Sequence, residues 1–175
     1  MNDILLAVII AVLATSLLII VFFKDKLFTT TVKTVPTPVT TATKEAAGVQ
    51  HLKIQAYERL VLLADRIALP NLITRLHVAG SSAVDMQMLL MQTIKQEFEY
   101  NVTQQIYVSA ESWNAIKQLR DQNLLVVNAV MSALSAETSA TDYAKIMMEY
   151  LAKNQLDNLH ELAAEVIAFE AKKLM

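Results

Sequence analysis

Hydrophobic residues are grouped in two different ways along this chain of 175 residues. Residues 4–23 form an unbroken run that contains no charged residue, glycine or proline. As a helix this run spans about 30 Å, which matches the hydrocarbon core of a bilayer. From residue 49 onward, apolar positions instead recur every three or four residues, the period of an amphipathic helix. The pattern therefore predicts a transmembrane anchor in residues 1–26, followed by a helical domain.

The flanks of the apolar run favour a retained span over two alternatives. A cleaved signal peptide has a basic N-terminal region and an apolar stretch of about 7–15 residues, whereas Met1, Asn2 and Asp3 include no basic side chain. A buried helix in a soluble domain of this size is seldom apolar on every side. We therefore expect the membrane to be a partner of the chain, contacted through residues 4–23.

Charges beside the predicted span indicate its orientation. Lys24, Lys26 and Lys33 follow the span, and no basic residue precedes it. The positive-inside rule then places the C-terminal domain in the cytoplasm and the N-terminus outside. The chain has no cysteine, which agrees with a reducing compartment without requiring one. The expected location is the inner (cytoplasmic) membrane, with a single pass.

Residues 27–47 are predicted to be a disordered linker between the span and the domain. The segment is rich in threonine and valine, contains Pro36 and Pro38, and shows no apolar period. A Thr-Val-Pro-Thr-Pro sequence favours extended, polyproline-like backbone. The soluble domain, residues 48–175, is thus expected to be held away from the membrane surface on a flexible tether.

Capping and helix-breaking residues divide the domain into helices. Pro70 ends a first helix and suits the first turn of the next, and Ser82 lies three residues before Asp85, as in a capping box. The predicted helices are 49–69, 71–78, 82–107, 110–134, 142–153 and 155–174. Asn154 is the expected cap of the last helix, and one continuous helix over 142–174 is the alternative. The sequence predicts an all-α fold, an antiparallel bundle of about five helices, because no segment alternates with a period of two.

The apolar stripes predict which residues face inward. In the long helix they follow steps of four, which drift around a helix of 3.6 residues per turn, so its two ends should contact different neighbours. Asn123 and Asn128 interrupt the next stripe and need hydrogen-bond partners if they are buried. The inward positions expected for the long helix and the last two helices are Met86, Leu90, Ile94, Phe98, Val102, Ile106; Ile146, Met147, Tyr150, Leu151; and Leu159, Leu162, Ala163, Val166, Ile167, Phe169.

Charge and composition exclude some classes of partner. The net charge is −2, and charges of both signs are interspersed through the domain. Binding to phosphate backbones needs clustered lysine and arginine, so nucleic acid is not an expected partner. The two glycines, Gly48 and Gly80, stand alone and form no phosphate-binding loop.

Catalytic signatures are weak in this sequence, and an enzyme is the less favoured reading. One Asp-x-x-His pattern occurs at Asp157 and His160, but a di-iron bundle needs two Glu-x-x-His motifs. No catalytic residue and no cofactor is therefore expected. The alternative hypothesis is a metal-binding bundle or metal-dependent enzyme that uses Glu97, Asp157, His160, Glu161 and Glu165.

Residues 96–109 and Trp113 form the most distinctive stretch, where amides, acids and aromatic side chains come together at a predicted helix–helix corner. One interpretation is a packed corner, in which Tyr107 and Trp113 fill space and the amides cap carbonyls. The other is a partner-binding surface, since tyrosine and tryptophan are enriched at binding hot spots. The candidate surface residues are Glu97, Tyr100, Asn101, Gln104, Tyr107 and Trp113.

The run QEFEYNVTQQIYVSAESW, together with the N-terminal span and the Thr/Pro tether, resembles a family of small single-span membrane-anchored helical proteins from Bacteroidota. The resemblance covers residues 52–175 loosely and residues 95–113 most closely. No activity is assigned to that family, so the resemblance implies an architecture and no mechanism.

Taken together, these patterns predict a membrane-tethered helical interaction domain. The expected role is an accessory or scaffold subunit of an envelope complex, with a protein partner or a second copy of the chain as its ligand. The tether, the mixed charges and the missing catalytic motifs all favour this function over the metal-binding alternative.

Overall fold

The computed structural model describes residues 39–135 and 137–175. Residues 42–175 form one compact unit. None of the helices described within it is both long and apolar enough to cross a membrane. The predicted span at residues 4–23, and the linker as far as residue 38, lie outside the described residues.

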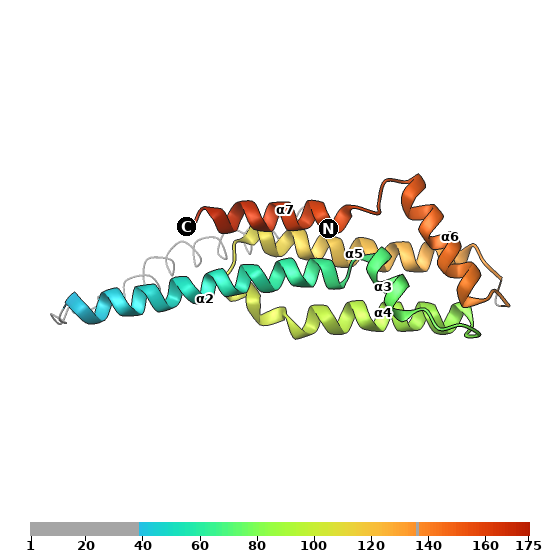
Figure 1. Cartoon of the computed structure of the whole chain (residues 1–175), viewed down its shortest axis with the longest axis horizontal. Helices are drawn as coiled ribbons and strands as arrows, with labels where there is room; N and C mark the ends of the chain where they lie inside the picture. Colours follow the sequence, from blue (N-terminus) through green and yellow to red (C-terminus); the bar gives the residue numbers. More distant parts are fainter. Residues whose placement is uncertain (1–38, 136) are drawn as a thin grey trace, which may run out of the picture. The chain divides into compact units, whose positions relative to one another are not determined.

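In the described part of the chain, every regular element is a helix, as the apolar periodicity predicted. Figure 1 shows that the long helices α2, α4, α5 and α7 run side by side and alternate in direction, while α3 and α6 both pack near the end at which α4 begins. The elements are α2 (Val39–Arg66), α3 (Leu69–Leu76), α4 (Ala83–Tyr100), the 3₁₀ helix η1 (Val102–Ile106), α5 (Ala110–Ser132), α6 (Ala140–Lys153) and α7 (Leu159–Lys172).

The first helix boundary differs from the predicted one. Helix α2 begins at Val39 rather than at residue 49, so residues 39–47 belong to a helix and not to the linker. Residues 44–47 are lysine, glutamate and two alanines, all good helix formers, but they carry no amphipathic stripe, and the stripe alone set the predicted boundary. At the other end, α2 stops at Arg66 rather than at residue 69, but Pro70 lies in the first turn of α3, as predicted.

The long predicted helix ends earlier than expected. Helix α4 stops at Tyr100, and residues 102–106 form the separate 3₁₀ helix η1. The side-chain amide of Asn101 donates to the carbonyl oxygen of Glu97 at 2.8 Å, so it replaces a backbone bond that a continuing helix would make. The stripe therefore ends at buried Phe98, and Val102 and Ile106 are exposed instead of inward.

The starts of α4 and α6 are tied to each other. Ser82 and Ser139 each cap a helix by accepting the backbone N–H of Asp85 or Asp142. In addition, the Ala83 N–H donates to the Thr138 carbonyl at 2.9 Å and the Ala140 N–H donates to the Ser81 carbonyl at 3.0 Å. The Ser82 capping box was predicted, whereas the Ser139 cap, which starts α6 at Ala140, was missed.

A break separates α6 from α7, as predicted, but its chemistry differs from the prediction. Asn154 does not cap α7; its side chain donates to the Tyr150 carbonyl at 2.8 Å and so closes α6. Helix α7 begins only at Leu159, after a turn in which Gln155 has a φ of 55°. The alternative of one continuous helix over 142–174 is wrong.

Two clusters of buried side chains hold the helices together, one at each end of α4 and α5. The first joins α3, α4, α5 and α6 around Leu90, Val127 and Met147, and the second joins α2, the end of α4, α5 and α7 around Leu60, Ile116 and Ile167. Within α4, Met86, Leu90 and Ile94 belong to the first cluster and Phe98 to the second. The expectation that the two ends of this helix contact different neighbours is confirmed.

The prediction of which residues of the last two helices face inward was partly wrong. Helix α6 buries Tyr143, Met147 and Leu151, while Ile146 and Tyr150 are exposed. Helix α7 buries Ala163, Ile167 and Ala171. Its larger side chains Leu162, Val166 and Phe169 are exposed, because α7 is apolar on more than one face and its small residues occupy the face against α5.

Candidate functional site

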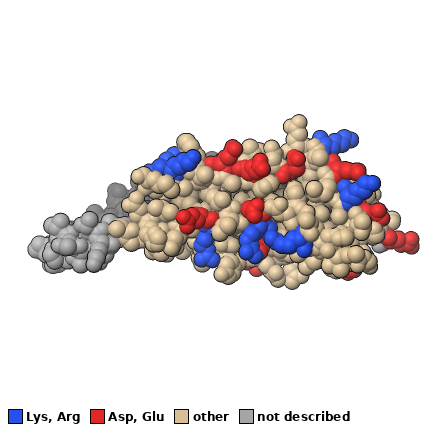
Figure 2. Space-filling view, viewed as in Figure 1, with Lys and Arg blue, Asp and Glu red and all other residues tan. Residues whose placement is uncertain are grey.

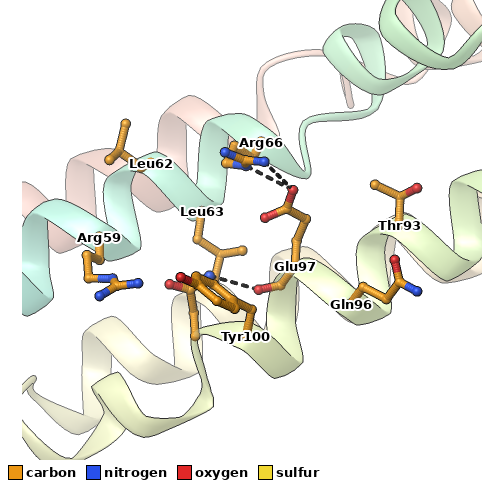
Figure 3. Close-up of a pocket in the computed structure, with 9 residues that line it drawn as sticks. Arg59, Leu62, Leu63, Arg66, Thr93, Gln96, Glu97 and Tyr100 are labelled. Atoms are coloured by element: carbon orange, nitrogen blue, oxygen red, sulfur yellow. Dashed lines mark hydrogen bonds and ion pairs between the residues drawn. The ribbon is translucent and has the colours of Figure 1, made fainter.

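A groove of about 510 Å³ lies between α2 and α4, at the corner that the sequence singled out (Figure 3). Each helix lines it with residues spaced i, i+3, i+4 and i+7, which is the spacing that places four side chains on one face of a helix. Asn101, just after α4, also lines the groove. The lining residues are Arg59, Leu62, Leu63 and Arg66 from α2, and Thr93, Gln96, Glu97 and Tyr100 from α4.

An ion pair joins the two walls of the groove. Arg66 donates from Nε and Nη2 to the Oε1 atom of Glu97, at 2.9 and 2.7 Å (Figure 3). The Glu97 side chain is largely covered, whereas that of Arg66 is more than half exposed. A partly exposed pair of this kind contributes about 0–1 kcal/mol to stability, so its main effect here is to neutralise Arg66 and fix the spacing of α2 and α4.

Tyr100 is the most accessible hydrophobic side chain in the groove. It is 74% exposed, and the Arg59 guanidinium lies 5.5 Å from the centre of its ring. This distance is within the range of a cation–π contact. Among the described residues, Arg59 has no carboxylate within ion-pair distance. The groove thus presents an aromatic ring and a cation that no described acid neutralises.

The other predicted surface residues lie outside this groove or support it. Asn101 is buried, and it shapes the corner because its amide closes α4 and its carbonyl accepts the Gln104 N–H at 3.0 Å. Trp113 packs against Phe98, with ring centres 5.2 Å apart, and belongs to the second core cluster. Gln104 contacts Thr103, and Tyr107 is exposed at the end of η1.

The six candidate residues are therefore divided between the two interpretations. Glu97, Tyr100 and Asn101 line the groove, while Trp113 is a packing residue. Sequence reasoning missed the α2 wall, Arg59, Leu62, Leu63 and Arg66. The sequence shows that these four residues share one face of a helix, but only the fold shows that this face of α2 lies beside α4.

The residues of the metal-binding hypothesis do not form a metal site. Glu97 on α4 is paired with Arg66 of α2, whereas Asp157 precedes α7 and the other three residues lie on α7. Over residues 39–135 and 137–175, no three histidine or acidic side chains come close enough together to hold a metal ion. The Asp-x-x-His pattern lies at the start of a helix without a matching motif on a neighbouring helix.

Charges of both signs are mixed on the face shown in Figure 2, where neither sign forms a continuous patch. Such a surface does not supply the clustered cations that a phosphate backbone needs.

Comparison with known proteins gives a family but no activity. No curated protein and no solved structure matches this chain. A protein-family comparison matches residues 2–174 to the family described as "Family of unknown function (DUF7935)". Since the match covers nearly the whole chain, the protein belongs to family DUF7935.

Proposed function

We propose that this protein is a membrane-tethered interaction domain, an accessory or scaffold subunit of an envelope complex that binds a partner protein through the α2–α4 groove. The observation that carries the proposal is the pairing of exposed Tyr100 with Arg59 inside a groove that two helices hold open. Tyrosine and arginine are the residue types most often found at binding hot spots, together with tryptophan.

The chemistry of the groove defines the partner. Leu62 and Tyr100 are exposed and offer apolar surface, while the charge of Arg66 is neutralised by Glu97 and that of Arg59 is not neutralised by any described acid. A partner segment that places an apolar side chain against Leu62 and Tyr100, and a carboxylate on Arg59, satisfies both requirements. We therefore expect an exposed acidic and apolar segment of a second protein.

The membrane part of the proposal rests on residues 4–23 and on the lysines that follow them. Their pattern supports a single-pass anchor in the inner membrane with the domain in the cytoplasm. A single-span anchor is also the architecture of the Bacteroidota proteins that the sequence resembles. Anchoring in the same membrane raises the effective concentration of a partner within reach of the tether. A groove of modest affinity is then sufficient for association.

The experiment is in-cell cross-linking of the full-length chain in its native host, followed by mild detergent extraction and mass spectrometry. Lys95 on α4 is the reporter, because its neighbour Gln96 lines the groove. We expect cross-links from Lys95 to an acidic segment of one other envelope protein. Tyr100→Ala and Arg59→Glu should each reduce these cross-links at least about tenfold, as loss of a hot spot does.

Tyr107→Ala is the matched control, since Tyr107 is exposed in the same corner but does not line the groove. It should leave the cross-links unchanged, and circular dichroism should show that all three variants are folded. Equal loss in Tyr107→Ala and Tyr100→Ala would place the interface elsewhere on the corner. Cross-links that survive both groove substitutions would exclude the groove as the binding site.

A further inference from the structure

Helix α7 carries a second apolar face that no described part of the chain covers. Leu162, Val166 and Phe169 are 51%, 42% and 63% exposed, although Ala163, Ile167 and Ala171 already fill the face against the core. The spacing i, i+4, i+7 aligns the three exposed side chains in one strip along the helix. We call Leu162, Val166 and Phe169 the α7 strip.

The α7 strip borders a hollow of about 580 Å³ between α5 and α7. Leu162 and Val166 line this hollow from α7, and exposed Leu125 lines it from α5. The apolar surface therefore extends from α7 across to α5. Contiguous exposed apolar surface of this kind marks an interaction site more often than isolated exposed residues do.

Charges beside the strip are arranged in a specific order. Glu161 and Glu165 lie in the first half of α7, and Lys172 lies in its last turn. At 3.6 residues per turn, these three positions fall within about 40° of each other around the helix, on one flank of the strip. This flank is therefore acidic at one end and basic at the other.

We propose that the α7 strip binds the α7 strip of a second copy of this chain, with the two helices antiparallel about a twofold axis near Val166. In that arrangement, residues at nearly equal distances from Val166 meet across the axis. Leu162, four residues before Val166, therefore packs on Phe169 of the second copy, three residues after it. In an antiparallel pair the same flank of each helix also meets itself. Glu161 then lies opposite Lys172 of the second copy, twice by symmetry.

The apolar register centres the axis between Glu165 and Val166, and the charge register centres it between Val166 and Ile167, so the two agree to within one residue. The two pairs of Glu161 with Lys172 also outnumber the single pair of Glu165 side chains near the axis, which is the argument for a second copy. A parallel twofold pair would instead bring opposite flanks of the two helices together, so Glu161 would not face Lys172 of the second copy. Glu161 and Glu165 also disfavour docking on an anionic membrane surface. This dimer is independent of the α2–α4 groove, because it uses a different face of different helices.

The chain has no cysteine, so single engineered cysteines test the pairing directly. The full-length chain in mild detergent is oxidised and analysed on non-reducing gels. V166C should form a covalent dimer at least about tenfold faster than M88C, an exposed site on α4, because only the axis brings two Cβ atoms within about 4 Å.

A mixture of E161C and K172C should form a disulfide between copies, whereas neither variant should do so alone. Sedimentation of cysteine-free chains adds a second measurement: Lys172→Glu should weaken the dimer, and the double reversal Glu161→Lys with Lys172→Glu should restore it.

Each alternative gives a distinct result that overturns the proposal. Equal rates for V166C and M88C would mean random collision. Disulfide formation by E161C alone would mean that the two helices pair in a different register. Protection of V166C from a soluble maleimide by phosphatidylcholine vesicles, without a covalent dimer, would make the strip a lipid-binding face. Failure of the double reversal to restore the dimer, in folded protein, would remove the charge argument.

Discussion

Asn123 is a polar residue of α5 that lies between the two apolar core clusters. Leu119 of the second cluster precedes it and Val126 of the first follows it, and Asn123 itself is buried. Its amide Nδ2 donates to the Ile67 carbonyl oxygen at 2.7 Å. This carbonyl belongs to the turn between α2 and α3, so a single hydrogen bond fixes that turn against the junction of the two clusters.

Replacing Asn123 by alanine should therefore destabilise the domain. The substitution removes the donor and leaves a buried carbonyl without its partner, which costs about 1–3 kcal/mol. The measurement is the free energy of unfolding from urea denaturation followed by circular dichroism. Asn128→Ala is the control, because Asn128 is exposed and its side chain bonds to Leu124 and Gln87 at the surface; it should change stability by less than about 0.5 kcal/mol. Equal effects of the two substitutions would contradict the role of the buried bond.

Tyr143 on α6 is a second buried polar residue with one partner. Its hydroxyl donates to the Val127 carbonyl oxygen at 2.9 Å, and burial raises the pKa of this hydroxyl above its ordinary value of 10.0. The hydroxyl therefore remains a hydrogen-bond donor at neutral and moderately alkaline pH. The apolar pattern predicted that Tyr150, and not Tyr143, faces the core. The periodicity of hydrophobic residues does not show which tyrosine hydroxyl has a carbonyl oxygen as its acceptor.

At the scale of elements, the turn between α6 and α7 shows why helix ends are harder to predict than helices. The Gln155 N–H donates to the Ala152 carbonyl, and the Leu156 N–H donates to the Leu151 carbonyl at 2.9 Å. These two bonds form a Schellman motif, in which Leu156 packs back toward the core. Such motifs usually place glycine at the residue with positive φ. Because glutamine occupies that position here, the sequence showed the slip in apolar register but not the turn that causes it.

Gln155→Gly should stabilise the domain by about 0.5–1 kcal/mol. A non-glycine residue in the left-handed region costs roughly 1–2 kcal/mol, and part of that gain is offset by the greater freedom of glycine in the unfolded chain. The measurement is again the free energy of unfolding.

The matched control is Gln118→Gly in the interior of α5, where the same change should lower stability by about 0.5–1 kcal/mol. If both substitutions lowered the stability equally, Gln155 would not bear the strain that its φ of 55° implies.

At the scale of the whole molecule, the bundle and its groove were predictable to different degrees. Helix existence followed from apolar periods, and the drifting stripe of α4 correctly predicted two sets of neighbours. The groove needed information that no local pattern contains, namely that one face of α2 lies beside one face of α4. For this reason Glu97 and Tyr100 were found from their unusual local chemistry, whereas Arg59 and Arg66 were missed.

The two core clusters share α4 and α5, and this predicts that they unfold together. Trp113 is the one tryptophan of the chain and packs in the second cluster, whereas Met147 lies in the first. Met147→Ala should cost about 2–5 kcal/mol because it leaves a cavity in a buried position. Since α4 and α5 pass through both clusters, the midpoint of the Trp113 fluorescence transition in urea should fall together with the midpoint measured by circular dichroism.

Ile167→Ala, in the same cluster as Trp113, is the comparison that separates one cooperative unit from two. Cooperative unfolding requires both substitutions to shift both signals to lower urea concentrations, with coincident transitions and an unchanged dependence on denaturant. Independent clusters would instead let Met147→Ala lower the circular dichroism midpoint while the Trp113 transition stayed in place. In that case the two ends of the bundle would unfold separately. The hydrogen bond between Asn123 and Ile67 would then lie at a hinge between the two clusters and would not couple their unfolding.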